Sequence, residues 1–405
     1  MSAPIDERPG GMSATPFAIA DRIAERVGGP VIVEDSSFRV LGYSPFVGPM
    51  DRGRTEAILG RRIPDAWLAH LTTTGSLDRL RGTNDVVDLP DGPWHAHRRL
   101  ITAFRAGGRL LGFAWVAEGQ RTLGEDAAGE FRRAVDEATP TLLGHLERLD
   151  AEEAHRSRLA WALLDGLPEA PAAADRLGFD RDSRFVVLSV AGPAATDARD
   201  EGEPTGVRML EHLRLCLDAF RRRWVVTPRG ADGGLAVVAL RADEGDETVA
   251  RLGQDVVRLA GAGQLRDLRV AASSVGTGLP TLPRLRDEAT AATVVTRSAG
   301  SFVTYADVEA EVLVADVVAA LPADVHLSGL DRLRALDRDG PAGGDLERTL
   351  RAFLACCGSA SATARALDVH VTTVRHRLER IAAVSGLRLD RPDVRIACDL
   401  LLRRP

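Results

Sequence analysis

Residues 361–381 read SATARALDVHVTTVRHRLERI and contain two adjoining helical patterns. A short run of small side chains ends near Asp368, and a longer run follows in which Val374, Leu378 and Ile381 recur at helical spacing. Those three side chains share one helical face and are expected to point inward. The pattern therefore predicts two helices joined by a tight corner.

The second of these helices, starting near Val371, is polar on the face opposite its apolar stripe. On a helical wheel Thr372 and His376 point directly away from the predicted core. Such a helix can enter the major groove, where polar side chains meet base edges while arginines and the helix N-terminus meet phosphates. The candidate DNA-binding residues are Ser361, Thr363, His370, Val371, Thr372, Thr373, Arg375, His376, Arg377 and Arg380.

Helical patterns on both sides complete a small all-α domain at 346–405. The first has Leu346, Leu350, Phe353 and Leu354 inward and ends at Gly358. Ser359 or Ser361 then caps the next helix. The last helix is a support helix whose inward residues are Val394, Ile396, Ala397, Leu400 and Leu401. This order predicts a helix-turn-helix, preceded by a Gly- and Pro-rich linker at 339–344.

The charge of the chain is divided unevenly. The net charge is -6, yet residues 346–405 hold 11 arginines and 6 acidic residues, a net +5. The remainder therefore carries -11. A basic C-terminal piece on an acidic body suits a nucleic-acid-binding head, because the body limits non-specific attachment to DNA.

The C-terminal run resembles the helix-turn-helix of the PucR/CdaR family of bacterial transcriptional regulators, and its corner also resembles the Fis type. Thr372 and His376 stand where that family usually has Asn and Tyr, which affects the expected base preference. The resemblance implies a DNA-binding regulator with a degenerate GGDEF-like middle domain. It rests on Ala364, Leu367, Val369, His370, Thr372, Thr373, Val374, His376, Arg377, Leu378, Arg380, Ile381 and Gly386–Leu389.

The middle of the chain, 166–300, reads as strand-helix-strand-strand-helix-strand-helix, the order of a ferredoxin-like palm. A diguanylate cyclase would need an acidic pair after the glycines of its central hairpin to hold metal and phosphate. Here the hairpin reads Ala231-Asp232-Gly233-Gly234-Leu235 and lacks that pair. The similar Gly343-Gly344-Asp345 precedes the predicted DNA-binding helices and is discarded. We expect a structural, dimerising or sensing module.

The N-terminal part, 16–140, has the element order of a GAF/PAS-like α+β sensor, after a disordered lead-in at 1–15. Within it, the runs 30–35 and 38–44 are predicted to form one hairpin, and the runs 95–104 and 109–119 a second. Residues 124–165 read as helix, interrupted or restarted at Pro140, with 141–165 as a connecting helix. A leucine stripe on this helix fits either pairing with a second copy or packing on its own domain. The stripe consists of Leu142, Leu143, Leu146 and Leu149. The two histidines His95 and His97 alone do not make a metal site, so no metal is expected. The candidate ligand-binding residues are Tyr43, Trp67, Trp94, His95, His97 and Trp115.

The four cysteines have no metal-ligand spacing. We interpret Cys216, Cys356, Cys357 and Cys398 as small core residues in a reducing cytoplasm, and a thiol switch at Cys356 and Cys357 stays open. No apolar stretch reaches membrane-spanning length, and the N-terminus lacks the apolar core of a signal peptide. A cytoplasmic protein without a membrane partner is expected.

The expected fold class is therefore multidomain α+β: a GAF/PAS-like sensor, a ferredoxin-like palm, a helical connector at 301–345 and an all-α helix-turn-helix. The expected function is sequence-specific transcriptional regulation without a cofactor. Expected partners are double-stranded DNA, an unknown small-molecule effector and a second copy in a homodimer or higher homo-oligomer. Two alternatives stay open, a sensor or scaffold that does not bind DNA and a nucleotide-processing enzyme that uses the palm.

Overall fold

The computed structural model describes residues 15–45, 52–89, 92–93, 98–118, 122–192, 205–220, 222–262, 265, 268–296, 300–339 and 345–404. These residues form two compact units. The first comprises Met1–Trp161 with Thr196–Arg208, and the second Ala162–Ala195 with Met209–Pro405. The predicted lead-in up to residue 14 and positions 340–344 of the predicted linker lie outside the described residues.

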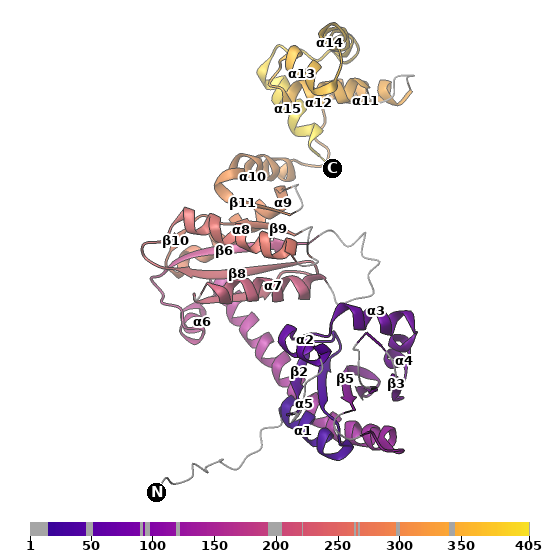
Figure 1. The fold of residues 1–405 in the computed structure, drawn as a ribbon. Coiled ribbons are helices and arrows are strands. Elements are labelled where there is room, and N and C mark those ends of the chain that lie inside the picture. The colour runs from indigo at the N-terminus through magenta and orange to yellow at the C-terminus, as the bar shows by residue number, and fades with distance from the viewer. Residues whose placement is uncertain are drawn as a thin grey trace. The chain divides into compact units, whose positions relative to one another are not determined.

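The first unit contains a five-stranded antiparallel sheet with the strand order β2-β1-β5-β4-β3 (Figure 1). Both predicted hairpins, β1 with β2 and β4 with β5, are confirmed. The strands are β1 (Val31–Asp35), β2 (Val40–Tyr43), β3 (Val87–Leu89), β4 (Arg99–Ala106) and β5 (Arg109–Ala117). The helices are α1 (Pro16–Val27), α2 (Arg52–Gly60), α3 (Asp65–Thr73), α4 (Ser76–Gly82) and α5 (Ala127–Leu164).

Helices cover both faces of this sheet. Successive side chains of a strand point to opposite faces, so Val31 and Val33 pack with α1 and α5, while Ile32 packs with α2, α3 and α4. Along β5, Trp115 lies on the second face, between the sheet and α3. The unit therefore has two apolar layers rather than one exposed sheet surface.

Helix α5 corrects the predicted break at Pro140, because the helix runs through this proline without interruption. A proline inside a helix removes the hydrogen bond to the carbonyl four residues earlier, here that of Asp136. Pro140 and Asp136 are both exposed, so water can serve that carbonyl. Of the leucine stripe, Leu142 is fully buried and Leu143 and Leu146 pack against the same core. This part of the stripe serves its own unit.

The second unit begins with a sheet of order β11-β9-β6-β8-β7, with β10 beside β6. The predicted alternation of strands and helices is confirmed up to α9. The strands are β6 (Arg184–Ala191), β7 (Trp224–Pro228), β8 (Gly233–Leu240), β9 (Arg269–Ala272), β10 (Gly276–Thr277) and β11 (Ser301–Thr304). The helices are α6 (Ala170–Leu177), α7 (Thr205–Ala219), α8 (Asp246–Ala262), the short 3-10 helix η2 (Leu279–Thr281) and α9 (Leu282–Val295).

The two faces of this sheet are covered by different helices. Val186, Leu188 and Val190 of β6 share a core with α7 and α8. On α9, Thr293 is buried and its hydroxyl reaches the Ser189 carbonyl oxygen of β6 at 3.5 Å. The helices α7 and α8 therefore form one layer and α9 the other.

Residues 301–345, the expected helical connector, contain one strand of this sheet followed by helices. Ser301–Thr304 form β11, which pairs in parallel with β9 and so extends the sheet. The helix α10 (Tyr305–Ala320) follows directly, and its Asp307 carboxylate accepts hydrogen bonds from the Thr304 backbone N–H and hydroxyl. These bonds lower the pKa of Asp307, with the backbone bond contributing most.

The C-terminal head contains five helices among the described residues, one more than the predicted domain: α11 (Ser328–Asp339), α12 (Asp345–Ala355), α13 (Ala360–Leu367), α14 (Val371–Ser385) and α15 (Pro392–Leu402) (Figure 1). The extra helix is α11. Its Leu330 and Leu333 are buried in the same core as Leu350 and Ile381. The predicted boundary at 346 therefore cuts through the core of the head, which begins at Ser328.

Candidate nucleic-acid interface

The corner between α13 and α14 is built by three local features. Ser359 accepts a hydrogen bond from the Ala362 N–H and caps α13. Asp368 ends that helix in the left-handed conformation, with φ of 53°. His370 then caps α14, because its Nδ1 accepts from the Thr372 N–H at 3.3 Å. The end of α13 and the start of α14 are thus set by Asp368 and His370, two residues inside the quoted stretch.

The inward face of α14 is the predicted one. Val374 and Ile381 are fully buried and Leu378 packs partly buried against the same core. The backbone bond from the Val369 N–H to the Ala364 carbonyl oxygen closes the turn at 3.0 Å. This packing fixes which side of α14 faces away from the head.

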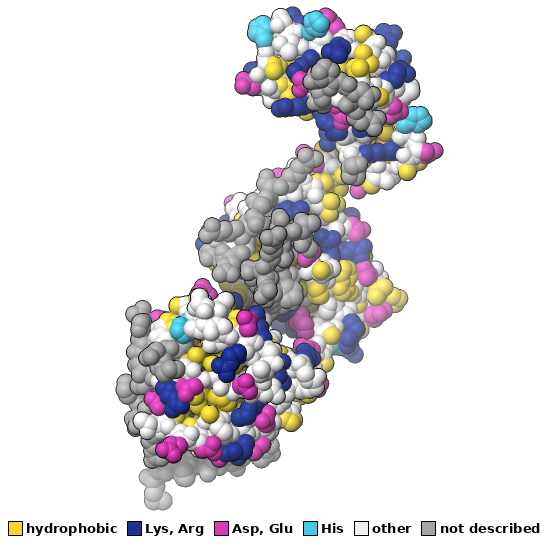
Figure 2. All heavy atoms as spheres, turned by 90° about the vertical axis from the view of Figure 1, so that its right-hand side faces the viewer, with side chains coloured by type: hydrophobic (Ala, Val, Ile, Leu, Met, Phe, Trp, Pro, Cys, Tyr) yellow, Lys and Arg dark blue, Asp and Glu magenta, His cyan; other side chains and the backbone are white. Residues whose placement is uncertain are grey.

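The outward face carries polar and positive side chains. His370, Thr372, Arg375, His376 and Arg380 are exposed, and Thr373 and Val371 are half-buried beside them. Figure 2 shows arginine and histidine side chains at the surface of the head, in the upper part of the view. Arg375 and Arg380 make no ion pair with any residue in the described part of the chain. Both guanidinium groups are therefore free for an external anion.

Arg377 has a different role from the one its sequence position indicates. Its NH2 donates to Asp345 Oδ2 at 2.7 Å and its NH1 to the Thr349 hydroxyl at 3.3 Å. Both partners belong to α12, and the Arg377 side chain is only 25% exposed. The guanidinium joins α14 to α12, so we remove it from the proposed phosphate contacts.

The two candidate residues on α13 differ in their exposure to solvent. Ser361 is exposed, whereas Thr363 is completely buried and donates its hydroxyl to the Ser359 carbonyl oxygen at 2.7 Å. A buried, satisfied hydroxyl cannot meet a phosphate, so Thr363 leaves the candidate set. Arg365 on the same helix was not predicted, although it is exposed and has no ion-pair partner among the described residues. The sequence could have indicated Arg365, because this arginine lies about one helical turn before the corner.

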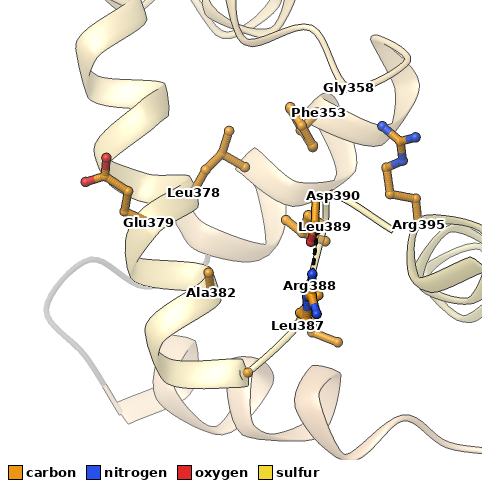
Figure 3. Close-up of a pocket in the computed structure, with 11 residues that line it drawn as sticks. Phe353, Gly358, Leu378, Glu379, Ala382, Leu387, Arg388, Leu389, Asp390 and Arg395 are labelled. Atoms are coloured by element: carbon orange, nitrogen blue, oxygen red, sulfur yellow. Dashed lines mark hydrogen bonds and ion pairs between the residues drawn. The ribbon is translucent and has the colours of Figure 1, made fainter. Parts of the chain in front are cut away.

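A groove of about 590 Å³ lies beside the second half of α14 (Figure 3). Its apolar lining comes from Phe353, Leu378, Ala382, Leu387 and Leu389. On one side, Arg388 forms an ion pair with Asp390 at 2.9 Å, drawn as a dashed line in the figure. None of the remaining candidate DNA-binding residues lines this groove, so it is a separate feature of the head.

The predicted ligand residues of the first unit are only partly brought together. Trp67 and Trp115 are 2% and 1% exposed, with ring centroids 5.4 Å apart, and both belong to the packed core. Tyr43 is 36% exposed and packs edge-on against Phe17 with ring centroids 5.2 Å apart, and it is not one of the residues of the core that holds the two tryptophans. Trp94, His95 and His97 lie outside the described residues.

Two polar groups accompany the tryptophans inside this core. The guanidinium of Arg99 lies 4.6 Å from the ring of Trp67, and Glu34 Oε2 accepts from Trp115 Nε1 at 2.8 Å. Glu34 is completely buried, and this burial raises the pKa of its carboxyl well above the usual range. The nearby Asp35 raises it further, while the Trp115 hydrogen bond acts in the opposite direction.

The hairpin formed by β7 and β8 has two glycines at closely packed positions. A side chain at Gly234 would come within 2.3 Å of Leu210 on α7, and one at Gly233 within 3.0 Å of the Val190 carbonyl oxygen. Neither position leaves ordinary van der Waals space for a side chain, which is a structural reason for the two glycines. Within the described ranges, no three His, Cys, Asp or Glu side chains gather as metal ligands would.

The cysteines follow two patterns. Cys216 and Cys398 are buried as expected, and burial raises the pKa of the Cys216 thiol to about 11 and raises that of Cys398. Cys356 is half-buried, and Cys357 is exposed in a left-handed conformation with φ of 52°. The interpretation of all four as core residues is wrong for Cys357, because α12 ends at Ala355, before the predicted Gly358.

Two family profiles match separate parts of the chain. Residues 346–403 match the family profile of the PucR C-terminal helix-turn-helix domain, and residues 165–295 match that of a GGDEF-like domain. The DNA-binding transcriptional activator AdeR of Bacillus subtilis (strain 168) is 22% identical over 386 residues. That similarity covers 92% of this chain and 88% of the relative.

Among solved structures, the chain is similar to a regulator of polyketide synthase expression from Bifidobacterium adolescentis. The sequence identity is 17%, with 62% of this chain and 98% of that chain covered and a TM-score of 0.31. Among the described residues, no helix has both the length and the apolar character needed to cross a membrane.

Proposed function

We infer that this chain is a transcriptional regulator of the PucR/CdaR type, which binds DNA through the helix-turn-helix of its C-terminal head. The observation that carries this conclusion is the PucR-type helix-turn-helix at 346–403. In the structure, that segment holds a helix whose outward face has unpaired arginines among the described residues and whose inward face is apolar. The basic charge of the same segment agrees with an anionic partner.

We propose that α14 enters the major groove with its N-terminal half. Arg375 and Arg380, with Arg365 from α13, contact phosphates, because their guanidinium groups are exposed and have no ion-pair partner in the described part of the chain. The N-terminus of α14 adds a further favourable place for a phosphate, because the positive end of the helix dipole lies there. These contacts position the head without reading the sequence.

The residues around Thr372 recognise the DNA sequence. The Nδ1 of His370 is occupied by the Thr372 N–H and lies 2.8 Å from the Thr372 hydroxyl oxygen. The other ring nitrogen, Nε2, is left to meet a base or phosphate. Thr372 and His376 are exposed on the same side, which supports base-edge contacts worth about 1–3 kcal/mol per base pair.

Selection of bound fragments from genomic DNA tests this function. The full chain should enrich a defined set of fragments, and a chain ending at residue 327, which lacks the whole head, should enrich none above background. Equal enrichment by the shortened chain would contradict the assignment of the head. The activator function of the Bacillus relative leads us to expect activation at the selected promoters, which a reporter placed behind each fragment measures.

The body is proposed to dimerise and to sense a small-molecule effector. The GGDEF-like profile at 165–295 and the helices on both faces of the N-terminal sheet support a palm and a GAF/PAS-like sensor. A dimer would place two heads on half-sites about one helical turn apart. Footprinting of the selected fragments should therefore protect two such half-sites.

A catalytic role for the palm is the competing function. It would need a metal-binding acidic pair at the β7–β8 hairpin, where Gly233 and Gly234 instead allow close packing. Incubation of the full chain with GTP and Mg²⁺ or Mn²⁺ distinguishes the two proposals. Turnover that is lost when Asp232 is replaced by Ala would favour an enzyme, and we expect none.

A further inference from the structure

Helix α10 has an unusual combination of composition and exposure. Its sequence YADVEAEVLVADVVAA is apolar on most sides, yet Val312 is its one buried residue. Leu313 is 64% exposed and Val317 is 40% exposed, and Val294 of the adjoining α9 is 66% exposed. A helix that is apolar nearly all round is normally buried on more than one side. One side of α10 packs on its own unit, so the opposite side is available to a partner.

The exposed side of α10 has the spacing of a helix–helix contact. Its apolar residues recur at alternating steps of four and three, the pattern that lets side chains of one helix fit between those of another. The four acidic residues of the helix lie outside this stripe on a helical wheel. We call this stripe the α10 seam, and it consists of Ala306, Ala310, Leu313, Val317 and Ala320, all of which are exposed.

We propose that the α10 seam pairs with the α10 seam of a second copy, with the two helices antiparallel. From Ala310 to Ala320 the steps of the seam are symmetric about the level of Ala315, so Leu313 of one copy meets Val317 of the other and Ala310 meets Ala320. A two-fold dimer uses the same surface on both copies, so that surface must complement itself. The α10 seam meets this requirement because its larger residues face each other across the two-fold axis. The small residues at its ends let the two backbones approach closely.

The charges of the helix favour this direction. Asp307, Glu309 and Glu311 lie in its first half, and α10 contains no arginine. Arg404 lies at the other end, where it donates to the carbonyl oxygens of Pro322 and Val325 at 2.6 and 2.8 Å. A parallel pair would align the acidic halves. The antiparallel pair instead places each acidic half near Arg404 and the second half of α10 of the other copy, in which Asp316 is the one acidic residue.

This inference rests on the dimer of the proposed function, and it assigns that dimer a contact surface. It adds the surface, the partner and the direction. The connection from α10 to the head is short, because only residues 321–327 separate α10 from α11. A dimer held at α10 would therefore keep two heads within reach of neighbouring half-sites.

Sedimentation of the full chain over a range of concentrations tests the surface. The wild-type protein should sediment as a dimer, and the double variant Leu313→Glu/Val317→Glu should need at least a tenfold higher concentration to dimerise. The matched control is Leu215→Glu, which changes a leucine of α7 that is 67% exposed. The control should behave as the wild type. A wild type that stays monomeric, or a double variant with unchanged dimerisation, would overturn the proposal.

Cross-linking tests the direction independently of any loss of folding. In a chain with Cys356→Ser and Cys357→Ser, the variants Ala310→Cys and Ala320→Cys are prepared separately and then mixed. The mixture should cross-link with a short bis-maleimide, and neither variant should cross-link alone, because ten residues along a helix span about 15 Å. Cross-linking of each variant with itself would contradict the antiparallel arrangement.

DNA binding separates failure of this surface from failure of the proposed function. If the wild-type chain binds selected fragments but the cross-link and the sedimentation shift are absent, the surface is wrong and the regulator function stands. If the chain pairs through α10 but binds no fragment, the surface stands and the proposed function is wrong.

Discussion

At the scale of single residues, Arg375 and Arg377 stand two positions apart on α14 but have different surroundings. Arg375 is exposed and has no ion-pair partner among the described residues, while Arg377 bonds to Asp345 and Thr349. The two arginines cannot be distinguished by composition. Their separate roles follow from the side of α14 that each one occupies.

Arg375→Ala should weaken binding to selected and random DNA by a similar factor. Removing one phosphate contact lowers the slope of log affinity against log salt by about 0.9. Titration of labelled duplexes at several salt concentrations measures both effects. The matched control is Arg377→Ala, which should leave this slope unchanged and instead reduce the free energy of unfolding by about 1–2 kcal/mol. The reverse pattern would contradict the proposed roles.

Glu34 should make the stability of the first unit depend on pH. Burial raises its folded-state pKa above that of the unfolded chain, so the folded state holds the proton more tightly. Its stabilising contribution is complete below the unfolded pKa of about 4.3 and is lost as pH rises towards the folded pKa. Glu34→Gln stays neutral and keeps an oxygen for Trp115.

Urea unfolding at several pH values measures this difference. The free energy of unfolding of the wild type minus that of Glu34→Gln should fall as pH increases above 4.3, by at most about 1.4 kcal/mol per pH unit. Glu25→Gln, which removes an exposed negative charge from α1, is the control for net charge. Parallel curves for wild type and Glu34→Gln would show that the buried carboxyl does not carry this effect.

At the scale of elements, the start of α14 depends on a histidine cap. His370→Ala removes the acceptor for the Thr372 N–H and should destabilise the head by about 0.5–2 kcal/mol. His370→Asn should restore most of this loss, since asparagine is also a good cap. Amide hydrogen exchange at Thr372 and Thr373 in the full chain reports the cap directly. His376→Ala, an exposed change on the same helix, should leave those rates as in the wild type.

Helix α5 should tolerate removal of its internal proline. Pro140→Ala restores a backbone N–H opposite the exposed Asp136 carbonyl and should stabilise the first unit by about 1–3 kcal/mol. Thermal unfolding of the full chain measures the shift. Glu147→Ala changes an exposed side chain of α5 without adding a backbone bond, so it should shift the melting temperature much less. A lower melting temperature for Pro140→Ala would show that the proline is needed for the path of the helix.

At the scale of the whole molecule, the boundary of the head has a measurable consequence. Leu330 and Leu333 of α11 are 1% and 0% exposed within the core of the head, and Gly329 lies against Leu387. A fragment of residues 328–405 should therefore unfold cooperatively, while one of 346–405 lacks part of that core. Circular dichroism during heating compares the two. Equal cooperativity would mean that α11 is dispensable.

The local structure of the C-terminal head follows from its sequence. The spacing of Val374, Leu378 and Ile381 predicts the inward face of α14, and with it the exposure of Thr372 and His376. Short apolar runs separated by turn residues predict the two hairpins of the first unit, and the order of runs predicts the succession of strands and helices in the second unit through α9. These features follow from short-range patterns, because side-chain direction repeats with the helix or strand period.

Contacts between residues far apart in the chain were decided only by the tertiary structure. Arg377 is withdrawn from the surface by Asp345, Thr363 is buried at the helix crossing, and α11 completes the core across the predicted linker. The glycines that indicate a linker do not reveal that the helices on either side of it share a core. Periodicity tells which face of a helix is apolar, but only packing decides what covers that face, because burial depends on the partner that arrives from elsewhere in the chain.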